Sequence, residues 1–130
     1  MSCQEIRFSK THEWARADGE LATIGITDYA VEQLNKEIVY VELPPLGKTV
    51  KQGETFGVVE AVKTAADLYA PLSGTVEEVN STISEDPSPL CQDPQGEGWL
   101  IKIRPADPAE WGRLMNADDY KKFVEEEGHH

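Results

Sequence analysis

Short runs of β-branched and aromatic residues, each ended within a few positions by proline, glycine, asparagine or aspartate, restrict this chain to a fold of short strands. The clearest run covers residues 38–43, and Pro44 and Pro45 end it. The chain of 130 residues holds ten glycines and eight prolines, which supply the turns that short strands need. Its length fits one domain.

The same pattern predicts the other elements up to residue 103. Thr27 or Asp28 can cap a short helix over residues 29–34, and Asn35 is a suitable stop. Residues 81–98, rich in Pro, Ser, Asp and Gly, are expected to form a loop with room for one helical turn. Strands are predicted over residues 5–8, 11–16, 21–26, 38–43, 49–50, 55–62, 66–70, 74–79 and 99–103.

Two helices are predicted to close the chain. Asp107 caps the first, Pro108 opens it, and it runs to about residue 115. Asn116 caps the second, which carries an apolar stripe. The sum is a mainly β fold, a flattened barrel or sandwich with short flanking and C-terminal helices. We expect one domain over residues 1–130, with a core over about 5–104 and closing helices over about 107–127.

The charge of the chain limits its partners. Acidic residues outnumber basic ones 24 to 12, giving a formal net charge of −12. Binding to nucleic acid or to an anionic membrane surface needs clusters of Lys and Arg, so neither is expected. Positively charged protein partners fit this charge, and so does simple solubility. The sequence holds no apolar run long enough to span a membrane.

The informative segment lies around Lys63. Two predicted strands face each other across residues 62–65, so their pairing as a hairpin would place Lys63 at or beside its tip. A modifying enzyme needs a lysine that is held away from neighbouring side chains on a rigid turn, and a hairpin tip meets both needs. A lysine in a turn is ordinarily just a solvated residue, so position alone does not separate the two interpretations.

The residue types of the hairpin distinguish a lysine that is modified from an ordinary solvated turn lysine. Glu-Ala-Val-Lys-Thr at 60–64, followed by Asp-Leu-Tyr-Ala-Pro-Leu-Ser-Gly at 67–74, resembles the lipoyl-bearing hairpin of glycine cleavage H proteins, within the wider lipoyl and biotinyl domain family. Biotin carriers flank the lysine with methionines, and Val62 and Thr64 stand in those places here. The resemblance extends in order through segments 11–14, 22–30, 39–44, 75–80 and 96–103. It covers roughly residues 6–124, whereas lipoyl domains of 2-oxo acid dehydrogenases are shorter.

The resemblance implies a carrier without an active site of its own. Lipoate would be amide-linked to Lys63, and Glu60 would serve recognition by the lipoylating enzymes. The arm would carry an aminomethyl group from glycine decarboxylase (P protein) to aminomethyltransferase (T protein), and electrons to dihydrolipoamide dehydrogenase (L protein). The expected compartment is the bacterial cytoplasm, or the mitochondrial matrix if a transit peptide has been removed.

The family's loaded arm folds into a surface cleft, and the matching positions here are Thr11, Glu13 and Asp67. Carboxylates and a hydroxyl suit a cationic amine. Each residue has a plainer interpretation: Glu13 as an exposed strand carboxylate, Asp67 as a residue that shapes the hairpin, and Glu60 as an ordinary solvent-facing side chain.

Other functions stay open at this point. Departures from the family pattern at Ala61, residues 34–37 and residues 88–92 leave room for a relay that hands lipoyl groups to 2-oxo acid dehydrogenases. An unmodified interaction module is a further alternative. No nucleophile elbow, phosphate-binding loop or dinucleotide fingerprint is present, and His12 has no partners at metal-ligand spacing. An enzyme or a metal site is therefore the least supported class.

Overall fold

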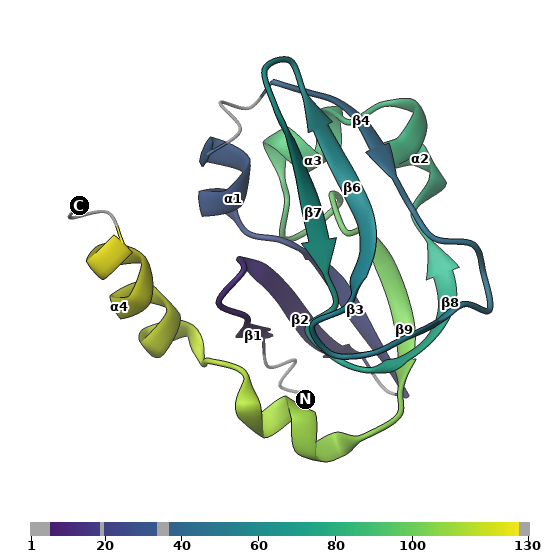
Figure 1. Ribbon diagram of the computed structural model, residues 1–130, viewed down its shortest axis with the longest axis vertical. Coiled ribbons are helices and arrows are strands. Elements are labelled where there is room, and N and C mark those ends of the chain that lie inside the picture. Colours follow the sequence, from purple (N-terminus) through teal and green to yellow (C-terminus); the bar gives the residue numbers. More distant parts are fainter. Residues whose placement is uncertain (1–5, 19, 34–36, 128–130) are drawn as a thin grey trace.

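The computed structural model describes residues 6–18, 20–33 and 37–127, which form two antiparallel sheets with short helices around them (Figure 1). The larger sheet has the strand order β1-β2-β3-β9-β8-β5, and the smaller has the order β4-β6-β7. The strands are β1 (Ile6–Phe8), β2 (Glu13–Asp18), β3 (Leu21–Ile26), β4 (Ile38–Glu42), β5 (Thr49–Val50), β6 (Thr55–Ala61), β7 (Ala65–Tyr69), β8 (Gly74–Val79) and β9 (Ile101–Pro105).

Both sheets contribute to one hydrophobic core. Ile24 and Ile103 of the larger sheet and Val59 of the smaller are fully buried in the same cluster. Burial of such aliphatic side chains is the main stabilising contribution in a domain of this size. The described strands form two sheets and no closed barrel, so the sandwich form of the prediction is confirmed. The predicted domain limits stay a prediction.

The strand over residues 38–43 is confirmed as β4, but it is not regular. Its pairing with β6 shifts between Ile38 and Tyr40, as in a β-bulge. Val39 and Tyr40 are consequently both turned outward and are 57% and 44% exposed. An apolar run in the sequence does not reveal such a bulge, because nothing in the run itself distinguishes the residues that face inward.

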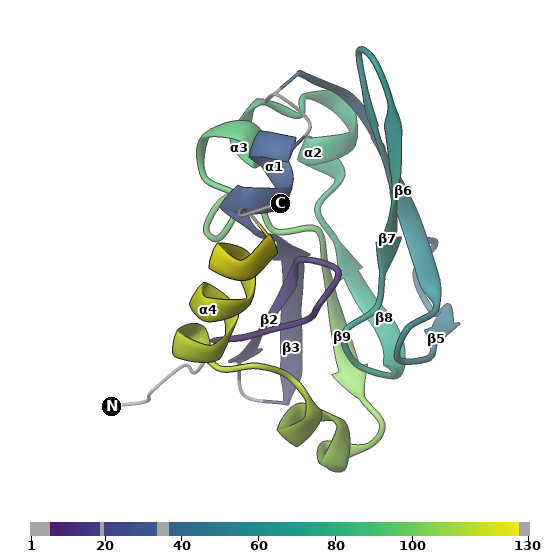
Figure 2. The ribbon, with the colours of Figure 1, turned by 60° about the vertical axis from the view of Figure 1, so that its left-hand side comes forward.

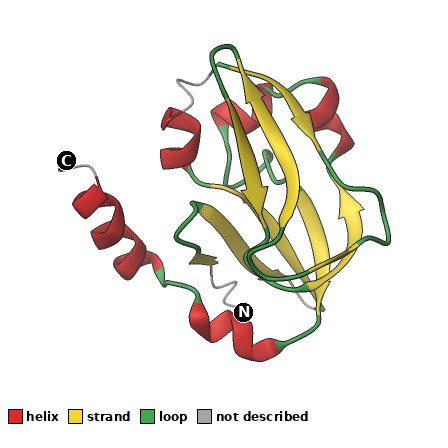
Figure 3. Cartoon of the chain, viewed as in Figure 1, coloured by secondary structure: helices red, strands yellow, loops and turns green. Residues whose placement is uncertain are grey.

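The helices lie at the periphery of the two sheets (Figure 3). They are α1 (Asp28–Gln33), α2 (Ser81–Glu85), α3 (Ser88–Gln92), the 3₁₀ helix η1 (Pro108–Arg113) and α4 (Ala117–Glu127). The expectation of a loop with one helical turn over residues 81–98 is wrong, since two helices form there. Ile83 and Leu90, one in each helix, are fully buried and anchor both turns to the core despite their polar surroundings.

The predicted N-caps of the two C-terminal helices are confirmed. The Asp107 side chain accepts a hydrogen bond from the Ala109 N–H, and the Asn116 Oδ1 accepts one from the Asp119 N–H. The first of these helices is of the 3₁₀ type and ends at Arg113, earlier than predicted. Helix α4 packs beside β1 (Figure 2), where Tyr120 joins a second apolar cluster with Phe8 and Trp14.

Two predicted strands begin later than expected. Residues 9–12 form a tight turn, in which the His12 N–H donates to the Ser9 carbonyl, so β2 starts at Glu13. Strand β9 starts at Ile101, although the Leu100 N–H also donates to the Ile24 carbonyl of β3 at 2.8 Å. The predicted helix stop at Asn35 and the strand start at Glu5 lie outside the described residues. None of the helices in the described part of the chain has the length and apolarity needed to cross a lipid bilayer.

Candidate functional site

Lys63 lies at the tip of the β6–β7 hairpin, which projects beyond the rest of the sheets (Figures 1 and 2). The last strand pair is Glu60 with Ala65, and the Ala61 N–H donates to the Thr64 carbonyl at 2.7 Å across the turn. The Val62 N–H donates to the Glu37 carbonyl at 3.0 Å, which ties the tip to the residues before β4. The predicted position of Lys63 is thus confirmed, and its side chain is exposed.

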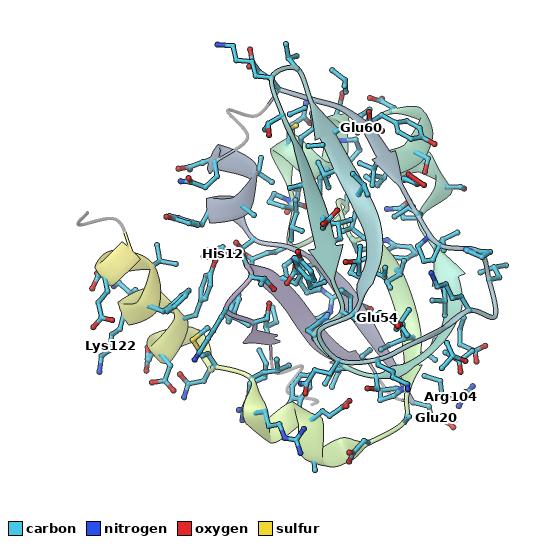
Figure 4. The ribbon with its side chains drawn as sticks, viewed as in Figure 1. His12, Glu20, Glu54, Glu60, Arg104 and Lys122 are labelled. Carbon is cyan, nitrogen blue, oxygen red and sulfur yellow. The ribbon has the colours of Figure 1, made fainter. Side chains whose placement is uncertain are left out.

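Glu60 is exposed near the upper end of the same hairpin (Figure 4). It lies opposite Ala65 of β7 and Tyr40 of β4 in the strand register. Because directly opposed residues in a sheet present their side chains on the same face, Glu60 and Tyr40 are neighbours there. Glu60 is therefore a carboxylate beside Lys63, and a role in enzyme recognition stays a prediction.

Glu13 is a buried carboxyl group, 1% exposed, so its interpretation as an exposed strand residue is wrong. Its Oε1 accepts hydrogen bonds from the hydroxyls of Thr11 and Ser9, the latter at 2.7 Å. Its Oε2 accepts from the Tyr69 N–H of β7 at 3.1 Å. Desolvation by burial outweighs these hydrogen bonds and raises the pKa of Glu13 to about 7.

Thr11 and Asp67 line one hollow between the 9–12 turn, α1 and the hairpin. Its volume is about 160 Å³, and its walls are largely apolar. Glu13 contacts Thr11 from the buried side. The structure therefore brings Thr11, Glu13 and Asp67 into one region, and Asp67 lies four residues along the chain from Lys63. The full lining consists of Thr11, His12, Ile26, Ala30, Gln33, Val59, Ala66, Asp67 and Leu68.

His12 fixes the turn beside this hollow. Its backbone has a positive φ of 71°, a conformation rare for residues other than glycine. Its Nδ1 lies 2.8 Å from the Tyr120 hydroxyl, which lies 2.7 Å from Thr27 Oγ1. Thr27 in turn caps α1 by accepting from the Ala30 N–H. Figure 4 shows His12 between α4 and the sheet, so one network joins α4, the turn and α1.

Sequence reasoning missed two partners of Glu13. The hydroxyl of Ser9 stands two residues before Thr11, and the spacing Ser9-x-Thr11-x-Glu13 is a signal that could have revealed it. The backbone of Tyr69 carries no such signal, because an N–H group is the same for any residue type. Within the described residues, no group of three or more His, Cys, Asp or Glu side chains could hold a metal ion.

A larger cavity, of about 460 Å³, lies further along β7 around Tyr69, Ala70 and Pro71 and shares Thr11 with the smaller hollow. At about 3.3 Å per strand residue, Ala70 lies about 23 Å along the chain from Lys63 and Asp67 about 13 Å. A lysine extended by an eight-carbon acyl group spans about 15 Å, from roughly twelve bonds that each advance about 1.25 Å. Such an arm is therefore long enough to reach the hollow at Asp67.

Known proteins are similar in sequence to this chain over most of its length. The model of the family described as "Glycine cleavage H-protein" matches residues 6–127. The "Glycine cleavage system H protein" of Anaeromyxobacter sp. (strain K) is 49% identical over 124 residues, covering 95% of this chain and 96% of the relative. That of Parvibaculum lavamentivorans is 50% identical over 121 residues, covering 93% and 96%.

A solved structure agrees as well. The crystal structure of a glycine cleavage system H protein from Mycobacterium marinum superposes with a TM-score of 0.83 at 38% identity, covering 93% of this chain and 97% of the other. Sequence and fold thus match over nearly the whole length of both chains. This chain belongs to the glycine cleavage H-protein family.

Proposed function

We propose that this chain is the lipoyl-lysine carrier of a glycine cleavage system, with lipoate amide-linked to Lys63. The observation that carries the proposal is the placement of Lys63: exposed at a projecting hairpin tip, within reach of a hollow with apolar walls and polar rim groups. Amide formation would remove the charge of the amine and extend the side chain. The bound dithiolane would supply the redox and group-transfer chemistry.

The residues around the hollow fit such a group. Ile26, Val59 and Leu68 offer apolar contact to a hydrocarbon arm, and Thr11 and Asp67 stand where a polar end would lie. Asp67 is exposed, so its carboxylate can attract a cationic amine. Glu13 holds the Thr11 hydroxyl in place, and its own raised pKa would fall beside a cation. The walls would also limit the access of water to a labile amine.

The partners follow from the family. The arm would meet glycine decarboxylase, aminomethyltransferase and dihydrolipoamide dehydrogenase in turn, and the chain would be the non-catalytic carrier between them. One tether visiting several sites keeps the intermediate at a high local concentration without releasing it. We expect this to take place in the bacterial cytoplasm, which the bacterial source of the relatives supports.

Intact mass and peptide mapping of protein from its native source test the attachment. We expect a lipoyl adduct on the Lys63 peptide of the wild-type chain and none in Lys63→Arg, which keeps the positive charge but offers no acylated amine. The variant should fold normally, because the side chain is exposed, and should lose all glycine cleavage activity in a reconstituted system. An unmodified Lys63 in cells with active lipoylation would leave an interaction module instead.

A lipoyl relay would use the same hairpin, so the mass measurement does not separate it from the carrier. Binding of the loaded chain to glycine decarboxylase does. We expect saturable binding and glycine-dependent loading of the arm. Transfer of the lipoyl group to a 2-oxo acid dehydrogenase without any binding to glycine decarboxylase would favour the relay.

A further inference from the structure

The larger cavity, of about 460 Å³, differs in charge from the chain as a whole. Its described lining includes two cationic side chains, Lys10 and Arg113, and no aspartate or glutamate, although acidic residues outnumber basic ones 24 to 12 in the sequence. Both cations are exposed, so they stand at the rim. The apolar part of the lining is buried or half-buried and consists of Phe8, Tyr69, Ala70, Pro71, Leu114 and Met115.

Arg113 is oriented at this rim by neutral groups. Its Nη1 donates to Gln52 Oε1 at 3.4 Å, and Gln52 Nε2 donates to the Pro71 carbonyl at 3.0 Å. Among the described residues, neither Arg113 nor Lys10 forms an ion pair with a carboxylate. The cavity therefore offers two positive charges that the surrounding acidic chain leaves unneutralised.

Two carboxyl groups lie near the lining but are engaged elsewhere. Glu110, three residues before Arg113 in η1, accepts hydrogen bonds from the N–H and the hydroxyl of Ser73, both at 2.6 Å. Glu13 is 1% exposed and accepts its hydrogen bonds from behind the lining. Because burial raises the pKa of Glu13 to about 7, this group is mostly protonated at pH 6 and adds little negative charge to the cavity.

We propose that the larger cavity is a binding site for a small amphipathic carboxylate, whose hydrocarbon body packs on the apolar lining and whose carboxylate pairs with Arg113 and Lys10. The site is distinct from the hollow beside Asp67, where the exposed carboxylate favours a cation instead. Helix η1, which carries Arg113, lies at the end of the molecule away from the hairpin tip (Figure 1). The inference needs no group on Lys63 and is independent of the proposed function.

Charge and size select this class of ligand. One N–H of Arg113 donates to Gln52, which leaves other donors of its planar fork for a carboxylate. An uncharged apolar molecule would cover both cations without pairing them, which is unfavourable. A large polyanion would be repelled by the net charge of −12, whereas a single carboxylate meets mainly the two local cations. The volume lies within the range of about 300–1,000 Å³ that is usual for small-molecule sites.

Titration of the full-length, ¹⁵N-labelled chain with sodium octanoate at pH 6, followed by amide chemical shifts, tests the site. We expect saturable shifts in residues 8–11, 52–53, 69–70 and 113–115, with a Kd of about 1–10 mM for a ligand of about ten non-hydrogen atoms. Octanamide has the same shape without the charge and should bind about tenfold more weakly. Acetate, which lacks the hydrocarbon body, should not saturate over the same concentrations.

Arg113→Gln and Lys10→Gln locate the carboxylate. Each should weaken the binding of octanoate about three- to tenfold and leave that of octanamide within about twofold, because the apolar lining is kept. Lys48→Gln and Lys122→Gln remove exposed lysines outside the cavity and should change neither affinity. Binding of octanamide also shows that each variant is folded, and Lys10→Gln decides the matter if Arg113→Gln is not.

Three results would overturn the carboxylate site. The first is equal affinity of the wild-type chain for octanoate and octanamide, and the second is saturation by acetate at the same concentrations as octanoate. The third is a loss in Lys48→Gln or Lys122→Gln as large as that in Arg113→Gln, which would indicate an effect of net charge alone. None of these results bears on the attachment of lipoate to Lys63, which peptide mapping decides separately.

Discussion

At the scale of single residues, Glu13 is the group with the most unusual environment. Its carboxyl group is removed from water and receives three hydrogen bonds, yet its pKa is raised to about 7. A carboxyl group that changes charge near neutral pH can accept the hydrogen bond of Thr11 both when it is protonated and when it is ionised. A cation nearby would favour the ionised form. Its protonation therefore links the stability of the fold to the state of the hollow.

The raised pKa predicts how stability depends on pH. Between the ordinary glutamate pKa of 4.5 and about 7, the folded chain keeps a proton on Glu13 that the unfolded chain has lost. The free energy of unfolding should therefore fall as pH rises through this window, by about 3 kcal/mol at about 1.4 kcal/mol per pKa unit. In Glu13→Gln this part of the slope should vanish.

Urea unfolding at intervals from pH 4.5 to 8 measures the effect, with Glu78→Gln as a control that removes an exposed carboxylate. The contribution of Glu13 is isolated by the difference between the slopes of the wild type and Glu13→Gln. Equal slopes in these two proteins would show that the carboxyl group is not titrating near neutral pH in the folded chain.

At the scale of elements, the walls of the hollow come from segments far apart in the chain. The hydroxyl of Tyr120 links two of these segments. Tyr120 of α4 contacts His12 of the turn and Thr27 before α1, and its ring stacks on Phe8 at 4.5 Å. Thr27 and Tyr120 are both buried, so the loss of either partner leaves polar groups that water cannot easily satisfy. Helix α4 thereby holds the turn that carries Thr11 and Glu13.

Tyr120→Phe removes this hydroxyl and keeps the stacked ring. We expect a loss of about 1–2 kcal/mol in the free energy of unfolding, because His12 and Thr27 both lose that contact. Amide hydrogen exchange in α4 and in residues 9–12 should accelerate together. Tyr40→Phe, which removes a hydroxyl from a half-exposed ring on the other side of the fold, should change neither quantity. Faster exchange in α4 alone would mean that the helix does not hold the turn.

The elements also show where sequence reasoning succeeds. The β6–β7 hairpin and the caps at Asp107 and Asn116 were predictable, because each depends on residues a few positions apart. The 9–12 turn was not predictable, because the positive φ of His12 is held by Tyr120, 108 positions away. The helical content of the segment that forms α2 and α3 was underestimated, because single buried residues in polar segments give no periodic signal.

At the scale of the whole molecule, charge acts against compactness. A net charge of −12 on 130 residues produces repulsion that the folded state concentrates and the unfolded state relieves. The described ion pairs of Arg104 with Glu20 and Glu77 are exposed and contribute little. The stability of the fold must come mainly from the shared core of the two sheets.

The melting temperature should therefore rise with salt. Between about 0.01 M and 0.2 M NaCl the screening length falls from about 30 Å to below 10 Å, which weakens repulsion across the molecule. We expect an increase of a few degrees, measured by thermal unfolding at pH 7.5. A melting temperature that falls with salt would indicate that attractive pairs dominate instead. Sodium sulfate is avoided, since sulfate stabilises folded proteins by exclusion from their surface.

The hydrogen bond from Val62 to Glu37 has a consequence for how tightly the hollow must hold an attached arm. With the hairpin tip fixed, the free end of a 15 Å arm is confined to a half-sphere, which corresponds to a local concentration of about 0.2 M. A hollow that bound the detached group with a Kd of only about 20 mM would then be filled about nine-tenths of the time. For an arm attached at Lys63 as proposed, weak intrinsic affinity would thus be enough to hold it in the hollow and would leave it free to depart when a partner competes.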